Sequence, residues 1–379
     1  MIDPAWFVDR LAQQDVHFYT GVPDSLLKHL CSHVMRELPR ESHVIAANEG
    51  AAVGIAIGHY LRTSEPALVY LQNSGFGNTV NPLLSLADDE VYGVPMVLLV
   101  GWRGQPGVKD EPQHVKQGRV MQALIEAMEL PSAVLPTDEA AAGACIDEAV
   151  AVARDRLCPY VVLVEKDSFS PPAATGPGDQ LEASDLASRE DALIALVDVL
   201  GEETINVSTT GMLSRELFEY RQRAGQSGER DFLTVGGMGH ASSIAMGVAV
   251  HEAEREVWCL DGDGAALMHL GTLAVIADHG AGNLFHVVFN NGVHDSVGGQ
   301  PTSIGVVDLA ATARALGYGY AASVTALDEL PTRIAEMREA GGPALLELRV
   351  RPGNRSDIGR PTRTPGQSKE AFMTALGAR

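Results

Sequence analysis

The sequence predicts an α/β protein with two related, doubly wound domains, each built on a parallel sheet. Short apolar segments that end in glycine or polar turns alternate with helical segments along the chain, which is typical of parallel sheets with helices on both faces. The pattern occurs twice, at a separation of 189 positions. A chain of 379 residues is also too long for a single typical hydrophobic core and is long enough for two domains.

The first domain is expected to span residues 1–170. Short apolar runs predict its strands, and apolar residues at helical spacing predict its helices. Strands are expected at His17–Thr20, His43–Ala46, Ala67–Leu71, Met96–Val100 and Tyr160–Val164. Helices are expected at Pro4–Gln14, Leu26–Leu38, Ala51–Leu61 and Pro82–Asp88.

A segment rich in Pro, Gly and Ala, residues 171–187, has no apolar periodicity and is predicted to be a linker. The second domain, residues 188–379, repeats the alternation. Its expected strands are Thr204–Val207, Glu256–Leu260, Leu284–Phe289 and Ala344–Val350. Its expected helices are Arg189–Leu200, Ser214–Ala224, a run from Ala265 to Ile276, and a short helix from Ser368.

The internal repeat aligns a pattern of glycine and alanine residues in the two halves. A shift of 189 positions places Gly50 on Gly239 and Gly75 on Gly264 without a gap. Five positions between them also match, namely Ala52, Ile55, Ala56, Gly58 and Leu71. The same shift places Met238 opposite Glu49, and Asp263 opposite Ser74. The halves therefore share a frame and differ at the positions that carry chemistry.

The composition excludes several classes of function. A net charge of −21 without a basic stripe argues against nucleic-acid binding. The four cysteines are scattered without a CxxC pair, which indicates buried thiols in a reducing compartment. There is no apolar run of membrane-spanning length and no signal-peptide layout at the N-terminus. We expect a cytoplasmic protein that does not bind membranes.

The stretch from Leu260 to Val293 predicts a metal and diphosphate site. A strand ends in Asp261-Gly262-Asp263-Gly264, a helical run follows, and a second strand ends in a pair of asparagines. Both turns fall at the carboxyl ends of parallel strands, where open α/β sheets bind ligands. Asp263 and Asn291, 28 positions apart, offer hard oxygen ligands, and the glycines allow close approach of a diphosphate. This combination suits Mg²⁺ shared with a diphosphate.

A long polar loop, Gly101–Gly118, is the second notable stretch. It carries Arg103, Lys109 and His114. Long loops inside compact domains tend to be functional, although a solvated loop is the simpler interpretation.

Several motifs together resemble the phosphonopyruvate decarboxylases, a family that depends on thiamine diphosphate. These motifs are GVPDSLL, NEGAAV, QNSGFGNTVNPL, GWRGQPGVKDEPQHVKQG, the GDG and NN pair, HDSVGGQPT and NRSDIGRPTRTP, and they cover nearly the whole chain. The sulfopyruvate decarboxylases, a sister family, share this layout. The resemblance implies a pyrimidine-binding domain followed by a diphosphate-binding domain, without the middle domain of larger relatives.

The resemblance assigns the cofactor site. Glu49 would be the carboxylate that activates the aminopyrimidine of thiamine diphosphate, and Mg²⁺ would be held by Asp263, Asn291 and the carbonyl of Val293. Met238 would support the bent cofactor. The other residues expected to contact the cofactor are Asn73, Ser74, Thr210, Gly211, Gly237, Gly262, Gly264 and Ala265.

The resemblance also implies a small anionic 2-oxoacid substrate and a homo-oligomer, a dimer at minimum, with active sites formed between subunits. Candidates for proton transfer and for holding the carboxylate are Asp24, Ser25, His114, His294 and Asp295. The phosphonate needs basic residues, preferably a bidentate arginine. Two clusters compete for this role. One lies in the loop and comprises Arg103, Lys109 and Lys116, and the other lies in the C-terminal tail and comprises Arg355, Arg360 and Arg363. The loop is favoured, with Arg360 of the tail as a further contributor. Ser25 and His114 are also expected to contact the substrate.

Two other functions remain open at this stage. One is decarboxylation of sulfopyruvate, or carboligation by a related enzyme, because a sulfonate is also a tetrahedral anion. The other is a non-catalytic nucleotide-binding or regulatory protein that uses the GDG turn to bind phosphate. The second alternative leaves Glu49 and Asn291 without a purpose.

Overall fold

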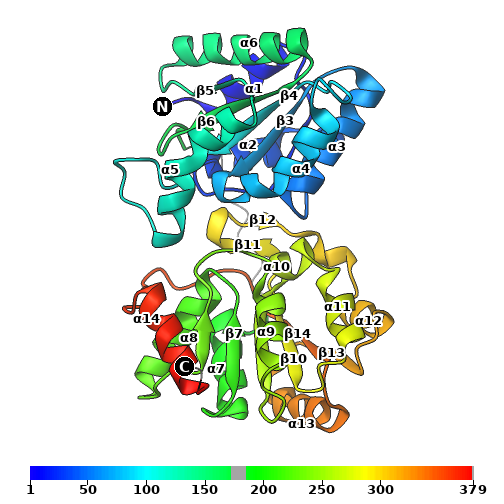
Figure 1. Ribbon diagram of the computed structural model, residues 1–379, viewed down its shortest axis with the longest axis vertical. Coiled ribbons are helices and arrows are strands. Elements are labelled where there is room, and N and C mark those ends of the chain that lie inside the picture. The colour runs from blue at the N-terminus through cyan, green and yellow to red at the C-terminus, as the bar shows by residue number, and fades with distance from the viewer. Residues whose placement is uncertain (172–184, 378–379) are drawn as a thin grey trace. The chain divides into compact units, whose positions relative to one another are not determined.

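A computed structural model describes residues 1–171 and 185–377, which form two compact units, Met1–Gly178 and Asp179–Arg379. Each unit is an α/β layer structure with helices around a central sheet (Figure 1). The predicted linker, residues 171–187, lies mostly outside the described residues, so its bounds stay a prediction. Among the described helices, none is long and apolar enough to cross a membrane.

The first unit contains a six-stranded sheet in the order β2-β1-β3-β4-β6-β5, in which every neighbouring pair is parallel. Its strands are β1 (Tyr19–Gly21), β2 (His43–Ile45), β3 (Ala67–Gln72), β4 (Met96–Gly101), β5 (Ser132–Val134) and β6 (Pro159–Val164). Its α-helices are α1 (Pro4–Ala12), α2 (Lys28–Glu37), α3 (Glu49–Thr63), α4 (Val80–Pro82), α5 (Pro112–Ala127) and α6 (Glu139–Arg156).

The second unit contains a six-stranded parallel sheet in the order β13-β14-β10-β9-β7-β8. Its strands are β7 (Ile205–Ser208), β8 (Asp231–Leu233), β9 (Val257–Gly262), β10 (Leu284–Asn290), β13 (Tyr320–Val324) and β14 (Ala344–Arg349). Two short antiparallel strands, β11 (Val293–His294) and β12 (Gln300–Pro301), pair separately. The helices are α7 (Arg189–Leu200), α8 (Met212–Arg223), α9 (Ala241–Ala249), α10 (Asp263–Met268), α11 (Thr272–His279), α12 (Leu309–Ala315), α13 (Leu330–Ala340) and α14 (Pro365–Ala375).

The two sheets have the same strand order. Read from the other edge, the second sheet runs β8-β7-β9-β10-β14-β13, which matches β2-β1-β3-β4-β6-β5 strand for strand. In both sheets the chain first adds a strand toward one edge, and then crosses back and adds strands toward the other edge. This is the doubly wound arrangement. The predicted fold class is therefore confirmed, and the common topology agrees with the repeat of 189 positions.

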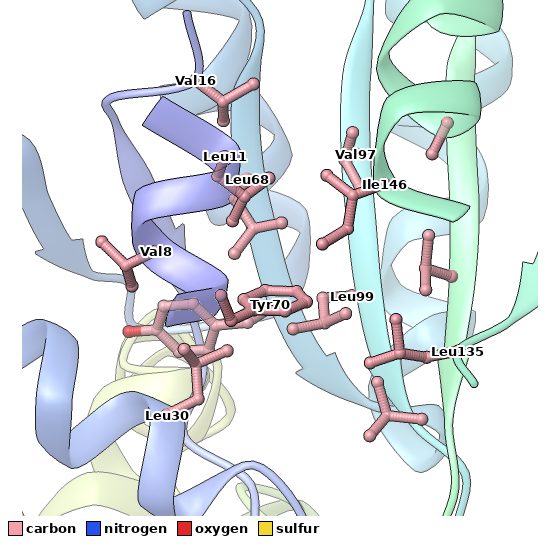
Figure 2. Packing of buried hydrophobic residues seen from close by; sticks show 14 of the residues in the cluster. Val8, Leu11, Val16, Leu30, Leu68, Tyr70, Val97, Leu99, Leu135 and Ile146 are labelled. Carbon is pink, nitrogen blue, oxygen red and sulfur yellow. The ribbon is translucent and has the colours of Figure 1, made fainter. Parts of the chain in front are cut away.

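Successive residues of the central strands supply two hydrophobic layers, one on each face of a sheet. In β3, Leu68 and Tyr70 join the cluster under α1, α2 and α6 (Figure 2), whereas Val69 and Leu71 join the cluster on the opposite face. In β9, Trp258 and Leu260 join the cluster on one face of the second sheet, and Val257 and Cys259 join the cluster on the other face. Because side chains alternate across a strand, burial on both faces requires nearly continuous apolar strands.

The structure corrects three predicted segments. The loop Gly101–Gly118 ends early, because α5 begins at Pro112, a residue favoured at the first helical position. The helical run from Ala265 to Ile276 is divided into α10 and α11 by the non-helical backbone of His269, with φ −134° and ψ 46°. The C-terminal helix α14 begins at Pro365, where Thr364 and Gln367 form a capping box.

Candidate active site

The predicted site residues of each unit follow the carboxyl ends of its own parallel strands. In the first unit, Asp24 follows β1, Glu49 follows β2, and Asn73 and Ser74 follow β3. Arg103 follows β4. The second unit repeats the pattern: Thr210 and Gly211 follow β7, Gly237 and Met238 follow β8, Asp263 follows β9, and Asn291 follows β10. Each set therefore gathers at the ligand-binding edge of its own sheet.

Glu49 is a buried carboxylate at the first position of α3. The preceding residue, Asn48, caps the helix by accepting a hydrogen bond from the backbone N–H of Ala51. The Glu49 side chain is 5% exposed, and burial raises its pKa, although a hydrogen bond of 2.7 Å from Asn78 Nδ2 to Oε2 acts against this increase. A buried carboxylate with a raised pKa is suited to sharing a proton with a bound base.

Asp24 is fully buried, and its carboxylate accepts hydrogen bonds from two residues of the first unit. Gln72 donates a hydrogen bond of 2.6 Å to Oδ1, and the backbone N–H of Leu26 donates to Oδ2 at 3.0 Å. Burial raises the pKa of this carboxyl, and the hydrogen bonds and Arg103 act in the opposite direction. A Cβ on Gly101 would lie 2.0 Å from Asp24 Oδ2, so the end of β4 must be a glycine.

Arg103 is held by Asp110, a carboxylate of the same loop for which no role was predicted from the sequence. Asp110 accepts hydrogen bonds from Arg103 Nε at 2.8 Å and Nη2 at 2.5 Å, and also from the backbone N–H of Gly104. Arg103 Nη1 donates to Ser25 Oγ at 2.9 Å. The arginine holds the pKa of Asp110 well below its usual range, overcoming the effect of burial. The guanidinium is therefore preorganised, with Ser25 beside it.

Asn73 and Ser74 make contacts within the first unit. Asn73 Nδ2 donates to the carbonyl of Arg103 at 2.7 Å, and the N–H of Arg103 donates to Asn73 Oδ1 at 3.1 Å. Asn73 thus clamps the backbone at the start of the loop with both ends of its amide. Ser74 Oγ donates to Gln72 Oε1 at 2.6 Å, which orients the amide that binds Asp24.

The remaining candidates for substrate binding in the loop and the tail differ in their exposure to solvent. His114 lies on the first turn of α5, and its pKa is lowered by burial and by Arg103. Its Nδ1 is buried without a hydrogen-bond partner among the described groups. Lys109 is exposed on the loop, and Arg360 is exposed in the C-terminal segment of the second unit.

In the second unit, Asp263 lies at the start of α10 and is 3% exposed. Burial raises its pKa to about 6, against hydrogen bonds from Thr302 and from the backbone of Gly264 and Asn291. Thr302 Oγ1 donates to Oδ2 at 2.5 Å. The contact with Asn291 brings the two predicted metal ligands together, and Thr302, the last residue of the HDSVGGQPT motif, is a neighbour for which no role was predicted.

Asn291 has a defined side-chain orientation. Its Nδ2 donates to Asp295 Oδ2 at 2.7 Å, and its Oδ1 accepts from the N–H of Val293 at 3.1 Å. Val293 begins β11, which pairs with β12. His294 is partly buried, and burial lowers its pKa to about 4. A Cβ on Gly264 would lie 2.9 Å from His294 Cε1, so the GDG turn packs closely against this ring.

Glycines shape the remaining predicted cofactor contacts. Gly211 precedes α8 with φ 106°, and Gly237 has φ 65°, both in the region that favours glycine. Gly262 caps α10, and Ala265 is buried in that helix. A Cβ on Gly239 would lie 2.9 Å from Met268 Cβ, so the loop that carries Met238 packs tightly against α10.

The oxygen donors of the second unit fit a hard divalent cation. Among the described contacts, no lysine or arginine pairs with the buried carboxylate of Asp263, which is stabilised by hydrogen bonds alone. A buried carboxylate without a basic partner is costly unless it is protonated or binds a cation. A carboxylate oxygen, an amide oxygen and backbone carbonyls are ligands that Mg²⁺ prefers.

Comparison with known proteins gives a consistent result for both units. The family described as "Thiamine pyrophosphate enzyme, N-terminal TPP binding domain" matches residues 5–128, and the corresponding C-terminal TPP binding domain matches residues 209–348. A phosphonopyruvate decarboxylase of Streptomyces viridochromogenes is 36% identical over 98% of this chain and 94% of its own. That of Streptomyces hygroscopicus is 38% identical over 98% and 93%. A sulfopyruvate decarboxylase of Methanosarcina acetivorans is 25% identical over 97% and 96%.

Proposed function

The chain belongs to the thiamine pyrophosphate enzymes, in the family of the phosphonopyruvate decarboxylases, and we propose that it converts 3-phosphonopyruvate to phosphonoacetaldehyde and CO₂. The observation that carries this proposal is the similarity to two phosphonopyruvate decarboxylases over nearly the full length of every chain compared. The sulfopyruvate decarboxylase that matches over a similar length is less similar, at 25% identity.

Both units supply groups that suit the cofactor. We propose that Asp263, the side chain of Asn291 and the carbonyl of Val293 hold Mg²⁺, which in turn would bind the diphosphate. Support comes from the buried Asp263 carboxylate and from the contact between Asp263 and the backbone of Asn291. Glu49 is proposed to bind the aminopyrimidine. Thiamine diphosphate, when bound, supplies an electron sink for the loss of CO₂.

The role proposed for Glu49 is to hold a proton at its carboxyl group. Its burial favours the neutral form, and Asn78 stabilises the ionised form, so the carboxyl can exchange a proton with a bound nitrogen base. No basic residue pairs with Glu49 in the described contacts, so a hydrogen bond with the aminopyrimidine would meet little competition.

Arg103 is proposed to bind the phosphonate. Its described contacts use three of the five N–H groups of the guanidinium, two with Asp110 and one with Ser25, so two remain for an anion. Its side chain is 20% exposed. Ser25, Lys109, His114 and Arg360 stay further candidates for the same substrate. Asp24, His114 and His294 are the candidates for proton transfer to the product.

Three further statements belong to the same proposal. Phosphonoacetaldehyde retains the carbon–phosphorus bond, which places the reaction in phosphonate biosynthesis. The chain would act in the cytoplasm. It would act as a homo-oligomer, and light scattering of the purified protein tests this by its mass relative to 40.2 kDa.

A comparison of rates tests the function directly. Release of CO₂ should be measured from phosphonopyruvate, sulfopyruvate and pyruvate, with thiamine diphosphate and Mg²⁺ present. The proposal predicts the highest kcat/KM for phosphonopyruvate. A higher kcat/KM for sulfopyruvate would assign the chain to the sister reaction. Thiamine diphosphate with Mg²⁺ should raise the melting temperature, and NAD or ATP should not. The opposite result would contradict the proposal that thiamine diphosphate is the cofactor.

A further inference from the structure

A buried network of charged residues leads to the predicted metal ligand Asn291. Arg189, the first residue of α7, donates from Nε and Nη2 to the two carboxylate oxygens of Glu216, each at 2.9 Å. Its Nη1 donates to Asp295 Oδ2 at 2.9 Å. The same Asp295 oxygen accepts from Asn291 Nδ2 at 2.7 Å. The exposed fractions of the Arg189, Glu216 and Asp295 side chains are only 9%, 2% and 12%.

This network determines which end of the Asn291 amide faces the predicted metal site. A carboxylate paired with arginine can only accept hydrogen bonds, so the NH₂ group of Asn291 must point to Asp295. The amide oxygen then points away from Asp295, where it accepts from the Val293 N–H and retains a second lone pair. A reversed amide would present an NH₂ group in place of the oxygen that a cation needs.

The contacts of Asp295 argue against its predicted role in proton transfer. Besides Arg189 and Asn291, the backbone N–H of Gly353 lies 3.1 Å from Oδ1 and 3.2 Å from Oδ2. All of these partners donate hydrogen bonds, and they come from separate parts of the second unit. A carboxylate held in this way is a fixed acceptor.

We propose that Asp295 is a positioning residue, which fixes the Asn291 amide with its oxygen toward Mg²⁺, and that Arg189 fixes Asp295. This proposal rests on the proposed function, in which Asn291 is a metal ligand. Residues that orient metal ligands through hydrogen bonds change metal affinity when they are replaced, typically by about 10-fold to 100-fold.

The test is the Mg²⁺ affinity of Asp295→Asn in the presence of saturating thiamine diphosphate. An asparagine at this position can donate as well as accept, so it permits the reversed amide of Asn291. Titration calorimetry should show a Kd for Mg²⁺ about 10-fold or more above that of the native protein. The kcat at saturating Mg²⁺ should fall by a much smaller factor than the Mg²⁺ affinity, because excess metal refills the site.

Asp231→Asn provides the matched control. Asp231 forms a buried pair with Arg221 in the same unit, with side-chain exposures of 3% and 5%, and it has no described contact with Asn291 or Asp263. Its replacement should leave the Kd for Mg²⁺ unchanged. If Asp295→Asn does not fold, Arg189→Lys is the second variant. Lysine keeps the positive charge but cannot form all the hydrogen bonds of the guanidinium, so this variant should also raise the Kd for Mg²⁺.

Two outcomes would overturn the positioning role. One is a native Kd for Mg²⁺ in a folded Asp295→Asn protein. The other is a large loss of kcat at saturating Mg²⁺ with unchanged affinity, which would return Asp295 to proton transfer. Both leave the proposed function intact. That function would fail separately if the native protein did not decarboxylate phosphonopyruvate, or if Asp263→Ala bound Mg²⁺ and cofactor normally.

Discussion

Gly75 lies so close to Glu49 that any side chain at position 75 would displace the carboxylate: a Cβ there would lie 1.9 Å from Glu49 Oε1. The backbone after β3 therefore forms one wall around the carboxylate that we propose activates the cofactor. Gly75→Ala should displace Glu49 from its hydrogen bond with Asn78 and lower kcat by at least about 10-fold, because misplacement of a catalytic group by an ångström is costly.

Gly77→Ala is the control for this prediction. No atom lies within 4 Å of a Cβ at Gly77, and its backbone is not in the left-handed region, although it belongs to the same turn. Its kcat should be close to that of the native protein. Equal losses in the two variants would show that the turn is sensitive to any change and that the contact with Glu49 has no special role.

Glu49→Gln tests the proton-holding role with little change in shape. The amide cannot ionise, so kcat should fall by about 100-fold or more, as expected for loss of acid–base catalysis. Binding of thiamine diphosphate, measured by calorimetry, should be largely retained, because the metal site is unchanged. Near-normal turnover would exclude Glu49 as the activating group.

The positions of the main site residues could be predicted because they follow local patterns. Asp263 and Asn291 end apolar strand segments, and β9 and β10 are neighbours in the sheet, as the βαβ pattern of this stretch requires. The role of Glu49 came from the resemblance to the decarboxylases, although its position after a short strand and before a helix rich in alanine and glycine is also a local pattern. The equal strand order of the two sheets follows from the repeat, which was visible in the sequence.

Pairings between side chains could not be predicted, since no periodicity connects the partners. Asp110 captures Arg103 from within a loop that has no regular pattern. Asp295 and Arg189 are 106 positions apart and meet only after the second sheet is assembled. The start of α5 at Pro112 did have a signal, because proline is common at the first position of a helix.

Asp263→Ala should abolish the Mg²⁺ dependence of cofactor binding. Asp263 is the only carboxylate among the three proposed metal ligands, so its replacement leaves Mg²⁺ with two neutral protein ligands. Calorimetry should show weak binding of thiamine diphosphate that Mg²⁺ no longer strengthens. The melting temperature without cofactor should not fall, because burial of this carboxylate already disfavours its charged form. An unchanged cofactor affinity would refute the metal site.

His43 gives a prediction for the pH dependence of stability. Its imidazole Nε2 lies 2.8 Å from Tyr70 Oη, and burial lowers its pKa to about 4. A histidine whose pKa is lower in the folded state stabilises the fold above pH about 6.5, and this contribution is lost as the pH falls through about 4. The free energy of unfolding should therefore decrease over this range.

His43→Gln should remove part of that decrease, because glutamine does not titrate. Urea unfolding at several pH values between 7 and 4 would show a shallower pH dependence for the variant, with a difference on the order of 2 kcal/mol across the range. Parallel curves for the two proteins would mean that His43 is not a source of the acid sensitivity.

Arg103 offers the clearest test of substrate choice. Arg103→Ala removes a guanidinium that Asp110 and Ser25 hold in place, and the phosphonate would lose a charge-assisted bidentate partner. The KM for phosphonopyruvate should rise by about 10-fold to 100-fold, in line with about 1.5–3 kcal/mol for hydrogen bonds to charged groups. The KM for pyruvate, which has no phosphonate, should change much less.

Asp110→Asn should raise the KM for phosphonopyruvate by a smaller factor, because it weakens the two hydrogen bonds that orient Arg103 but keeps the guanidinium. Arg36→Ala is the control for charge alone, since Arg36 lies on α2 with its side chain 45% exposed and pairs only with its neighbour Glu37 among the described contacts. An equal rise in KM for both substrates in Arg103→Ala would move the phosphonate site to other basic residues, with Lys109 and Arg360 the next to replace.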